Sequence, residues 1–245
     1  MALDNRHYYD EFAASYERHR HHGYHEFIDE LETSLVRRYL RSDMQILEAG
    51  CGTGLLLNRL RQHTARAVGV DLSRGMLKKA RDRDLEVVQG SVTALPFSDA
   101  LFDLVYSFKV LAHVEAIEQA LAEMTRVLRP GGLLCAEFYN ARSLRYLIKR
   151  WKPPTPIATS AAAEKPLNDE AIYTRYDTLP RIRGYLPPSL RVQAVHGIRV
   201  ITPLSVLHRV PVVAPMLQSL ERFAADLPVL QEFGGFLLVV ARKEL

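Results

Sequence analysis

Short apolar runs alternate with segments of helical spacing through the middle of the chain. The apolar runs predict strands over 45–49, 66–71, 85–89, 101–108 and 132–139. Apolar residues recur every three or four positions over 55–63, 74–83 and 114–128, which predicts helices there. This β-α-β-α order predicts an open α/β sheet of parallel strands, doubly wound by right-handed crossovers, with helices on both faces.

Three regions flank this alternation. Residues 1–44 have helical spacing and predict an N-terminal helical cap. Residues 141–190 are rich in proline and contain the Ala-rich piece "ATSAAAE", which predicts a lid insertion after the fifth strand. Two further strands over 191–201 and 233–243, with a helix between them, bring the expected sheet to seven strands. We therefore expect one domain over 1–245, with its core over 45–140 and C-terminal strands and helix over 191–245.

Three glycines at alternating positions follow the first predicted strand in "LEAGCGTG", namely Gly50, Gly52 and Gly54. Glycine lets the backbone turn tightly and approach a ligand, and ligands of such sheets bind outside the carboxyl ends of the strands. A dinucleotide-binding fingerprint would place its third glycine at position 55, where this chain has Leu55. The spacing therefore favours a ligand other than a nicotinamide dinucleotide.

Four motifs follow one another in the chain. They are "LEAGCGTG" (47–54), Asp71 at the end of "RAVGVD", "QGSVTALPFSDALFDLVYSFKVLAHV" (89–114) and "EMTRVLRPGGLL" (123–134). Over about residues 9–140 the sequence resembles the class I S-adenosylmethionine-dependent methyltransferases, in particular the type 11 group. The resemblance implies a Rossmann-like, seven-stranded, mostly parallel sheet, with S-adenosylmethionine as cofactor and S-adenosylhomocysteine as product.

The same resemblance implies which residues bind the cofactor. Asp71 would accept hydrogen bonds from both ribose hydroxyls, Glu48 would lie near the ammonium group, and Phe108 would line the sulfonium end. Leu72 and Met76 would cover the adenine faces. The full set implied is Tyr16, Arg20, Glu48, Gly50, Cys51, Gly52, Gly54, Asp71, Leu72, Met76, Ser91, Val92 and Phe108.

Three positions of this set need comment: Ser91 departs from the family's pattern, and Tyr16 and Arg20 belong to the cap. The family often has Asp at the position of Ser91, so we expect the adenine amino group to meet an uncharged hydroxyl together with Val92 and nearby backbone. The segment "YYDEFAASYERHR" is similar to the family's N-terminal helix, with Glu17 in place of a second Asp. It implies Tyr16 and Arg20 at the methionine end, although packing of an amphipathic helix explains both equally well.

Methyl transfer needs an aligned acceptor and, for many oxygen acceptors, a general base. His113 follows the fourth strand on the expected acceptor side and is the catalytic candidate, although a structural role at a helix start is an alternative. Tyr139 and His196 are the other candidates. The cluster "HRHHGYHEF" contains His19, His21, His22 and His25, but Gly23 interrupts it and no Cys or Asp joins it, so we expect no metal.

The chain is nearly balanced in charge overall, but one region has a clear excess of basic residues. The 245 residues include 32 Lys and Arg and 28 Asp and Glu, a net charge of +4, yet residues 141–210 contain twelve basic and four acidic residues. This excess is either a solvated basic face or a site for an anionic substrate or partner. The aromatic residues of the same region favour a small or lipid-like acceptor, with an acidic group if the second interpretation holds. An RNA (tRNA) methyltransferase is an alternative, but its expected basic binding module is not visible. A cofactor-binding regulatory subunit without catalysis is another.

The remaining composition sets general expectations. Hydrophobic residues make up 48% of the chain, and no apolar run reaches the roughly 18 residues that cross a bilayer. The two cysteines, Cys51 and Cys135, form no disulfide framework, and the N-terminal residues have no apolar signal segment. We expect a cytoplasmic protein, and the sequence does not indicate its oligomeric state.

Overall fold

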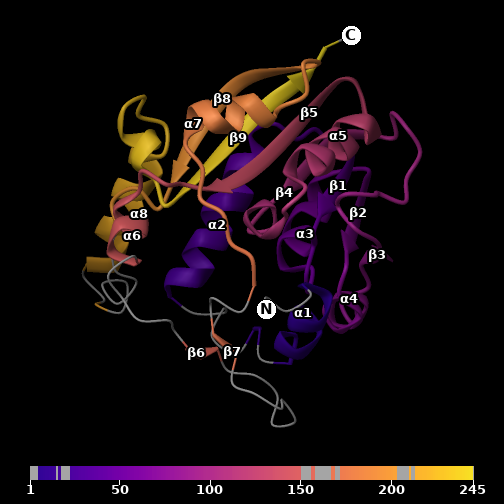
Figure 1. Ribbon diagram of the computed structural model, residues 1–245, viewed down its shortest axis with the longest axis horizontal. Coiled ribbons are helices and arrows are strands. Elements are labelled where there is room, and N and C mark those ends of the chain that lie inside the picture. The colour runs from indigo at the N-terminus through magenta and orange to yellow at the C-terminus, as the bar shows by residue number, and fades with distance from the viewer. Residues whose placement is uncertain are drawn as a thin grey trace.

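The computed structural model describes residues 5–14, 16–17, 23–149, 156–157, 167–168, 172–202, 210 and 213–244. Its main sheet has seven strands in the order β3-β2-β1-β4-β5-β9-β8. These strands are β1 (Gln45–Ala49), β2 (Arg66–Asp71), β3 (Glu86–Gln89), β4 (Phe102–Ser107), β5 (Leu128–Tyr139), β8 (Leu190–Ile198) and β9 (Phe236–Lys243). The first five pair in parallel, whereas β9 runs antiparallel to both β5 and β8. The expected doubly wound, mostly parallel sheet is confirmed (Figure 1).

Helices precede, cover and follow the sheet. The α-helices are α1 (Asn5–Phe12), α2 (Tyr24–Arg37), α3 (Leu55–Leu60), α4 (Arg74–Arg81), α5 (Ile117–Val127), α6 (Leu144–Lys149), α7 (Leu179–Tyr185) and α8 (Val213–Ala224). Short 3-10 helices are η1 (Arg61–His63), η2 (Leu111–His113) and η4 (Leu230–Phe233). A separate two-stranded sheet joins β6 (Pro156–Ile157) and β7 (Leu167–Asn168).

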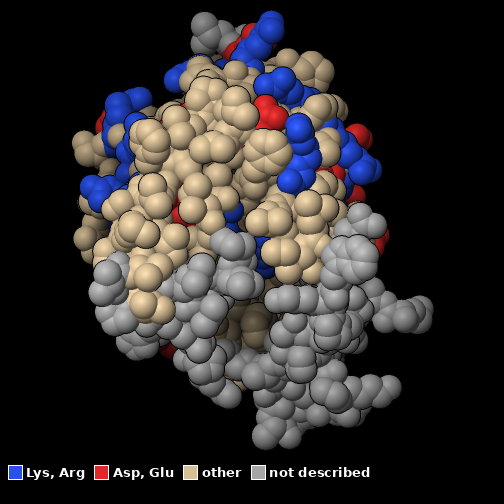
Figure 2. Space-filling view, turned by 90° about the vertical axis from the view of Figure 1, so that its left-hand side faces the viewer, with Lys and Arg blue, Asp and Glu red and all other residues tan. Residues whose placement is uncertain are grey.

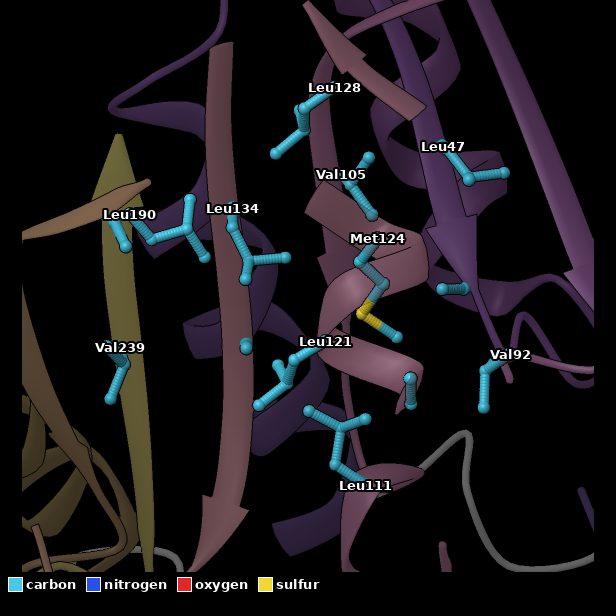
Figure 3. Packing of buried hydrophobic residues seen from close by; sticks show 14 of the residues in the cluster. Leu47, Val92, Val105, Leu111, Leu121, Met124, Leu128, Leu134, Leu190 and Val239 are labelled. Carbon is cyan, nitrogen blue, oxygen red and sulfur yellow. The ribbon is translucent and has the colours of Figure 1, made fainter. Parts of the chain in front are cut away.

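Alternate residues of each central strand enter two different cores. On one face, Leu47 of β1 and Val105 of β4 pack with Leu121 and Met124 of α5 (Figure 3). On the other face, Ile46 and Leu104 of the same strands pack with residues of α2 and α3. Because successive strand side chains point to opposite faces, these apolar runs lack a polar face, as expected of strands buried on both sides.

Several element ends differ from the sequence prediction. The helix predicted over 114–128 starts only at Ile117, after the 3-10 turn η2, and it ends at Val127. β5 then begins directly at Leu128, and the segment 129–132 forms a bulge in its pairing with β4. Gly131 adopts a φ of +78° in this bulge, which suits glycine. Arg129 fixes the bulge by donating to Asp103 of β4 (2.7 Å).

The predicted start of α4 depends only on residues that are close in sequence. The hydroxyl of Ser73 accepts from the Met76 amide (3.1 Å), so the predicted cap of α4 is confirmed. The predicted N-terminal helix is shorter than its pattern, because α1 ends at Phe12 and residues 13–14 form a turn.

No helix in the described part of the chain combines the length and the apolar character that crossing a membrane requires.

Candidate functional site

The glycine loop joins the ends of two neighbouring strands. The amides of Gly50 and Cys51 both donate to the carbonyl of Val70 at the end of β2 (2.7 and 2.9 Å). A Cβ on Gly50 would lie 2.2 Å from the side chain of Val110, so this position has no room for another residue. A Cβ on Gly52 would meet nothing within 4 Å, and the φ of this residue is +52°. Gly50 therefore serves the packing of the protein itself, while the loop at Gly52 faces open space.

Asp71 lies at the end of β2 and holds the glycine loop. Its Oδ2 accepts from the Gly52 amide (2.8 Å) and its Oδ1 accepts from the Ser73 amide (2.9 Å). Burial raises the pKa of this carboxyl, while the backbone donors oppose that rise. The Leu72 amide is a third backbone donor to this carboxyl, so of the four lone pairs on the two oxygens one remains for a further donor.

Glu48 lies in the interior at the end of β1, only 3% exposed. The hydroxyl of Tyr106 on β4 donates to its Oε2 (3.2 Å). Burial raises the pKa of Glu48 well above its ordinary value, and the negative charges of Asp71 and Glu32 add to this rise. A positively charged group beside Glu48 would favour its ionised form.

A cavity brings six of the predicted residues together with four that were not predicted. Its lining consists of Tyr16, Glu48, Gly50, Cys51, Gly52, Thr53, Leu55, Leu56, Phe108 and Lys109. Lys109 adopts a φ of +60°, a conformation that costs a non-glycine residue about 1 kcal/mol or more. Its ammonium group donates to Asp29 (3.0 Å) and Glu32 (2.8 Å) of α2, which hold the side chain in place.

The cap is tied to the sheet by two acidic residues. Asp10 of α1 accepts from the hydroxyl of Ser73 (2.6 Å) and from the Gly75 amide (2.9 Å), both at the start of α4. Glu17 accepts from Arg83 (2.7 Å), and Arg83 also donates to the carbonyl of Thr53 in the glycine loop (3.2 Å). The cap thus holds Tyr16 at the cavity, where sequence reasoning expected it.

The residues predicted to contact adenine differ from one another in burial. Leu72 is 37% exposed beside the start of α4, whereas Met76 and Val92 are buried. Met76 would therefore act through packing beneath an adenine ring. The hydroxyl of Ser91 lies 2.7 Å from that of Thr93 and accepts from the Thr93 amide (3.2 Å), so it stabilises its own turn.

His113 lies at the end of η2, which follows β4 in the chain. Its Nδ1 is 2.9 Å from the carbonyl of Tyr173. A carbonyl only accepts, so Nδ1 donates and the neutral ring carries its lone pair on Nε2, the tautomer that a general base uses. The rings of Tyr9 and Tyr139 lie beside it, with centroids at 6.3 and 5.7 Å.

The two other catalytic candidates differ in position. Tyr139 borders His113, and burial raises the pKa of its phenol. His196 instead contacts Asp226 (2.6 Å) and Tyr39 (2.8 Å), neither of which lines the cavity. Burial lowers the pKa of His196, the effect expected of a histidine held in packing.

The remaining predictions concern metal, thiol and cap residues. Arg20 and the histidines at 19, 21 and 22 lie outside the described residues. Among the residues that the structure describes, no group of His, Cys, Asp and Glu is arranged to hold a metal ion. Burial raises the pKa of Cys51 well above its ordinary value, so its thiol is not a nucleophile at neutral pH.

Sequence reasoning missed Tyr9, Asp10 and Lys109. Burial raises the pKa of Tyr9, and its neighbours include Tyr139, Tyr16 and Asp71, so it lies between the glycine loop and Tyr139. Tyr9 and Asp10 stand in the cap motif, which is the signal that could have found them. Lys109 directly follows β4 but has no local signal, because its partners come from α2.

Comparison with known proteins agrees with this geometry. A methyltransferase-domain family model matches residues 47–136. A malonyl-(acyl-carrier protein) O-methyltransferase of Serratia marcescens is 35% identical over 133 residues, which are 49% of this chain and 52% of that protein. A 24-methylenesterol C-methyltransferase 2 of Oryza sativa subsp. japonica is 31% identical over 57% of this chain and 37% of its own. The chain thus spans about half, or less, of the length of the curated relatives it matches.

Similarity of the fold covers nearly the whole chain, more than the sequence matches do. A crystal structure from Thermotoga maritima, described as a SAM-dependent methyltransferase and possible histamine N-methyltransferase, has a TM-score of 0.65. It is 20% identical and covers 98% of this chain and 99% of its own. Residues 47–136 thus match the methyltransferase domain, and the chain has the Rossmann-like fold of a structure described as a SAM-dependent methyltransferase.

Proposed function

We propose that this protein transfers a methyl group from S-adenosylmethionine to an O, N or C atom of a small or lipid-like acceptor. The observation that carries the proposal is the linked pair of Asp71 and Gly52 beside a cavity that also contains Glu48. These residues come from the ends of adjacent strands, where ligands of doubly wound sheets bind.

The residues present fit the methyl donor. Gly52 leaves the space that a side chain would fill, so a ligand can approach the backbone there. Asp71 retains a lone pair that can accept from a ribose hydroxyl beside the Gly52 amide. Glu48 is a buried carboxylate suited to an ammonium group, directly or through water.

In the proposed reaction the protein mainly binds and orients. Bound S-adenosylmethionine would supply a methyl group activated by its sulfonium charge. Tyr16 and Phe108 exclude water from that end of the cavity. His113 would accept a proton at Nε2 when the acceptor atom is an O–H or N–H, whereas an already ionised acceptor needs no base.

The acceptor class is supported by likeness and by charge. The relatives named above act, by their names, on a malonyl group of a carrier protein and on a sterol. On the face seen in Figure 2, Lys and Arg side chains gather along the borders of a broad uncharged area, with few Asp and Glu between them. Uncharged surface bordered by positive charge supports an acceptor that carries an acidic group.

A calorimetric titration with S-adenosylhomocysteine, with NAD as the control ligand, tests the proposal. Micromolar binding of S-adenosylhomocysteine and none of NAD is expected. Binding of NAD alone would contradict the proposal, because the glycine loop would then hold a dinucleotide. Turnover of radiolabelled S-adenosylmethionine with a metabolite extract would next separate an enzyme from a regulatory subunit.

A further inference from the structure

Two arginine side chains meet over one glycine. A Cβ built on Gly235 would lie 3.3 Å from Cδ of Arg199 and 3.6 Å from Cδ of Arg145. Arg145 comes from α6 and Arg199 follows β8, so segments far apart in the chain place two cations within reach of one point. The absence of a side chain at Gly235 makes room for both.

Aromatic rings orient both guanidinium groups. Arg145 lies over the rings of Phe236 and Tyr139, 5.1 and 5.9 Å from their centroids. Arg199 lies over the ring of Tyr24 at 4.8 Å. Such stacking holds a guanidinium through its flat face, and for Arg145 it leaves N–H donors at the edge for a planar anion. The Nε of Arg199 donates to the carbonyl of Thr202 (3.1 Å), so Arg199 contributes mainly its positive charge.

One of these donors is buried without a protein acceptor. Nη1 of Arg145 has almost no solvent exposure and no hydrogen-bond partner within the described part of the chain. A buried, charged donor without an acceptor is costly, so native proteins rarely keep one without a reason. An anionic ligand would satisfy it.

The nearby carboxylates are engaged elsewhere. Glu221 accepts from the amides of Val200 (2.7 Å), Ile201 (3.1 Å) and Thr202 (2.6 Å). Glu232 pairs with Arg142 (3.2 Å). These bonds fix the positions of both carboxylates, and the negative charge of Glu221 partly offsets the lowering of the Arg199 pKa.

Both the backbone conformation and the charge of Arg199 are energetically unfavourable. Its φ is +61°, in the left-handed region that non-glycine residues avoid. Burial lowers the pKa of its guanidinium, and the positive charge of Arg145 lowers it further. Backbone strain and mutual repulsion at one point are the features expected of a binding site built for negative charge.

An aromatic path connects this point with the cofactor cavity. The ring of Tyr139 lies between those of Phe236 and His113, with centroid separations of 5.0 and 5.7 Å. The rings of His113 and Tyr9 have centroids 6.3 Å apart. Tyr9 in turn neighbours Tyr16 of the cavity lining. An acceptor bound along these rings would extend from the methyl donor to the two arginines.

We propose that Arg145 and Arg199 form an anion subsite that binds a carboxylate of the methyl acceptor. A carboxylate fits better than a phosphate dianion, because the aromatic surroundings make removing a second charge from water more costly. The assignment of the anion to the acceptor rests on the proposed function, whereas the presence of the subsite does not.

The test uses the full chain and two isosteric probes, 3-phenylpropionate and its neutral amide, 3-phenylpropanamide. NMR titrations would be run with and without S-adenosylhomocysteine, on the wild type and on Arg145→Gln, Arg199→Gln and Arg145→Lys. Arg142→Gln is the matched control, since the side chain of Arg142 is 51% exposed and pairs with Glu232. S-adenosylhomocysteine affinity and thermal unfolding would check that each variant is folded.

We expect the wild type and Arg142→Gln to bind the acid at least tenfold more tightly than the amide. Arg145→Gln and Arg199→Gln should lose this preference, and Arg145→Lys should retain part of it. Equal binding of acid and amide, including no binding of either, would overturn the proposal, as would an unchanged preference in Arg145→Gln. Stronger displacement by inorganic phosphate than by acetate would overturn the carboxylate assignment. A wild type that prefers the acid but does not bind S-adenosylhomocysteine would contradict the proposed function alone.

Discussion

At the scale of single residues, Asp71 has two tasks, because it holds the Gly52 amide and also offers an acceptor to a ribose. We expect Asp71→Ala to weaken S-adenosylhomocysteine binding about tenfold to a hundredfold, since hydrogen bonds to a charged group contribute about 1.5–3 kcal/mol. Calorimetry would measure the change, with Asp43→Ala as the control, because Asp43 is 72% exposed. An unaltered affinity in a folded Asp71→Ala variant would remove the ribose assignment.

His113 is the second test at this scale. If it is the base, His113→Ala should lower kcat about a hundredfold or more while KM and S-adenosylhomocysteine affinity change little. The acidic limb of the pH–rate profile should disappear in the variant, because that limb reports protonation of the imidazole. His63→Ala, in η1, is the control. A loss of cofactor affinity as large as the loss of kcat would instead indicate a structural role.

How well single residues could be predicted depends on where their partners lie. The glycines and Asp71 belong to short motifs that resemble those of a known family, and this resemblance predicted that they lie close together. Asp10 and Lys109 act through α4 and α2, so their roles depend on long-range docking that no local pattern contains. Ser91 shows the opposite case, since its hydroxyl is engaged by a neighbour only two residues away.

At the scale of elements, α1 is attached to α4 mainly through Asp10. We expect Asp10→Ala to loosen α1, because the change leaves the Gly75 amide and the Ser73 hydroxyl without their charged acceptor. Hydrogen exchange over residues 5–14 should accelerate, and S-adenosylhomocysteine affinity should fall several-fold as the cap opens. His7→Ala, an exposed change on the same helix, is the control. Unchanged exchange in Asp10→Ala would mean that aromatic packing alone holds the helix.

The strands were predicted closely and the helix ends were not. A strand buried on both faces is a short apolar run with clear ends, so β1 and β2 have the predicted bounds. The start of α5 and the bulge at 129–132 depend on pairing with β4, which is distant in sequence. The tyrosine-rich cap has helical spacing beyond Phe12, but a turn replaces the helix there.

At the scale of the whole molecule, buried carboxyls make stability depend on pH. Burial raises the pKa of Glu137 well above the ordinary value of 4.5, with the negative charge of Glu32 adding to the rise. The contribution of such a group is complete below its unfolded pKa and is lost as the pH rises toward its folded pKa. The wild type should therefore lose free energy of unfolding relative to Glu137→Gln as the pH rises from about 5, by at most about 1.4 kcal/mol per pH unit.

Urea unfolding of the ligand-free protein at several pH values between 5 and 8 would measure this difference. Glu118→Gln, on the exposed side of α5, should follow the wild type throughout. Parallel curves for Glu137→Gln and the wild type would show that Lys109, whose charge opposes the rise, keeps Glu137 ionised at every pH.

The place of β9 in the sheet has a consequence for biosynthesis. β9 pairs with β5 on one side and with β8 on the other, yet it follows both in the chain. During translation, β8 therefore leaves the ribosome before its partner exists, and the edge of β5 stays open until residues 236–243 follow. Unpaired strand edges invite association between chains. The nascent protein is thus most exposed to aggregation after β8 has emerged and before residues 236–243 follow, when the other six strands of the sheet have been synthesised.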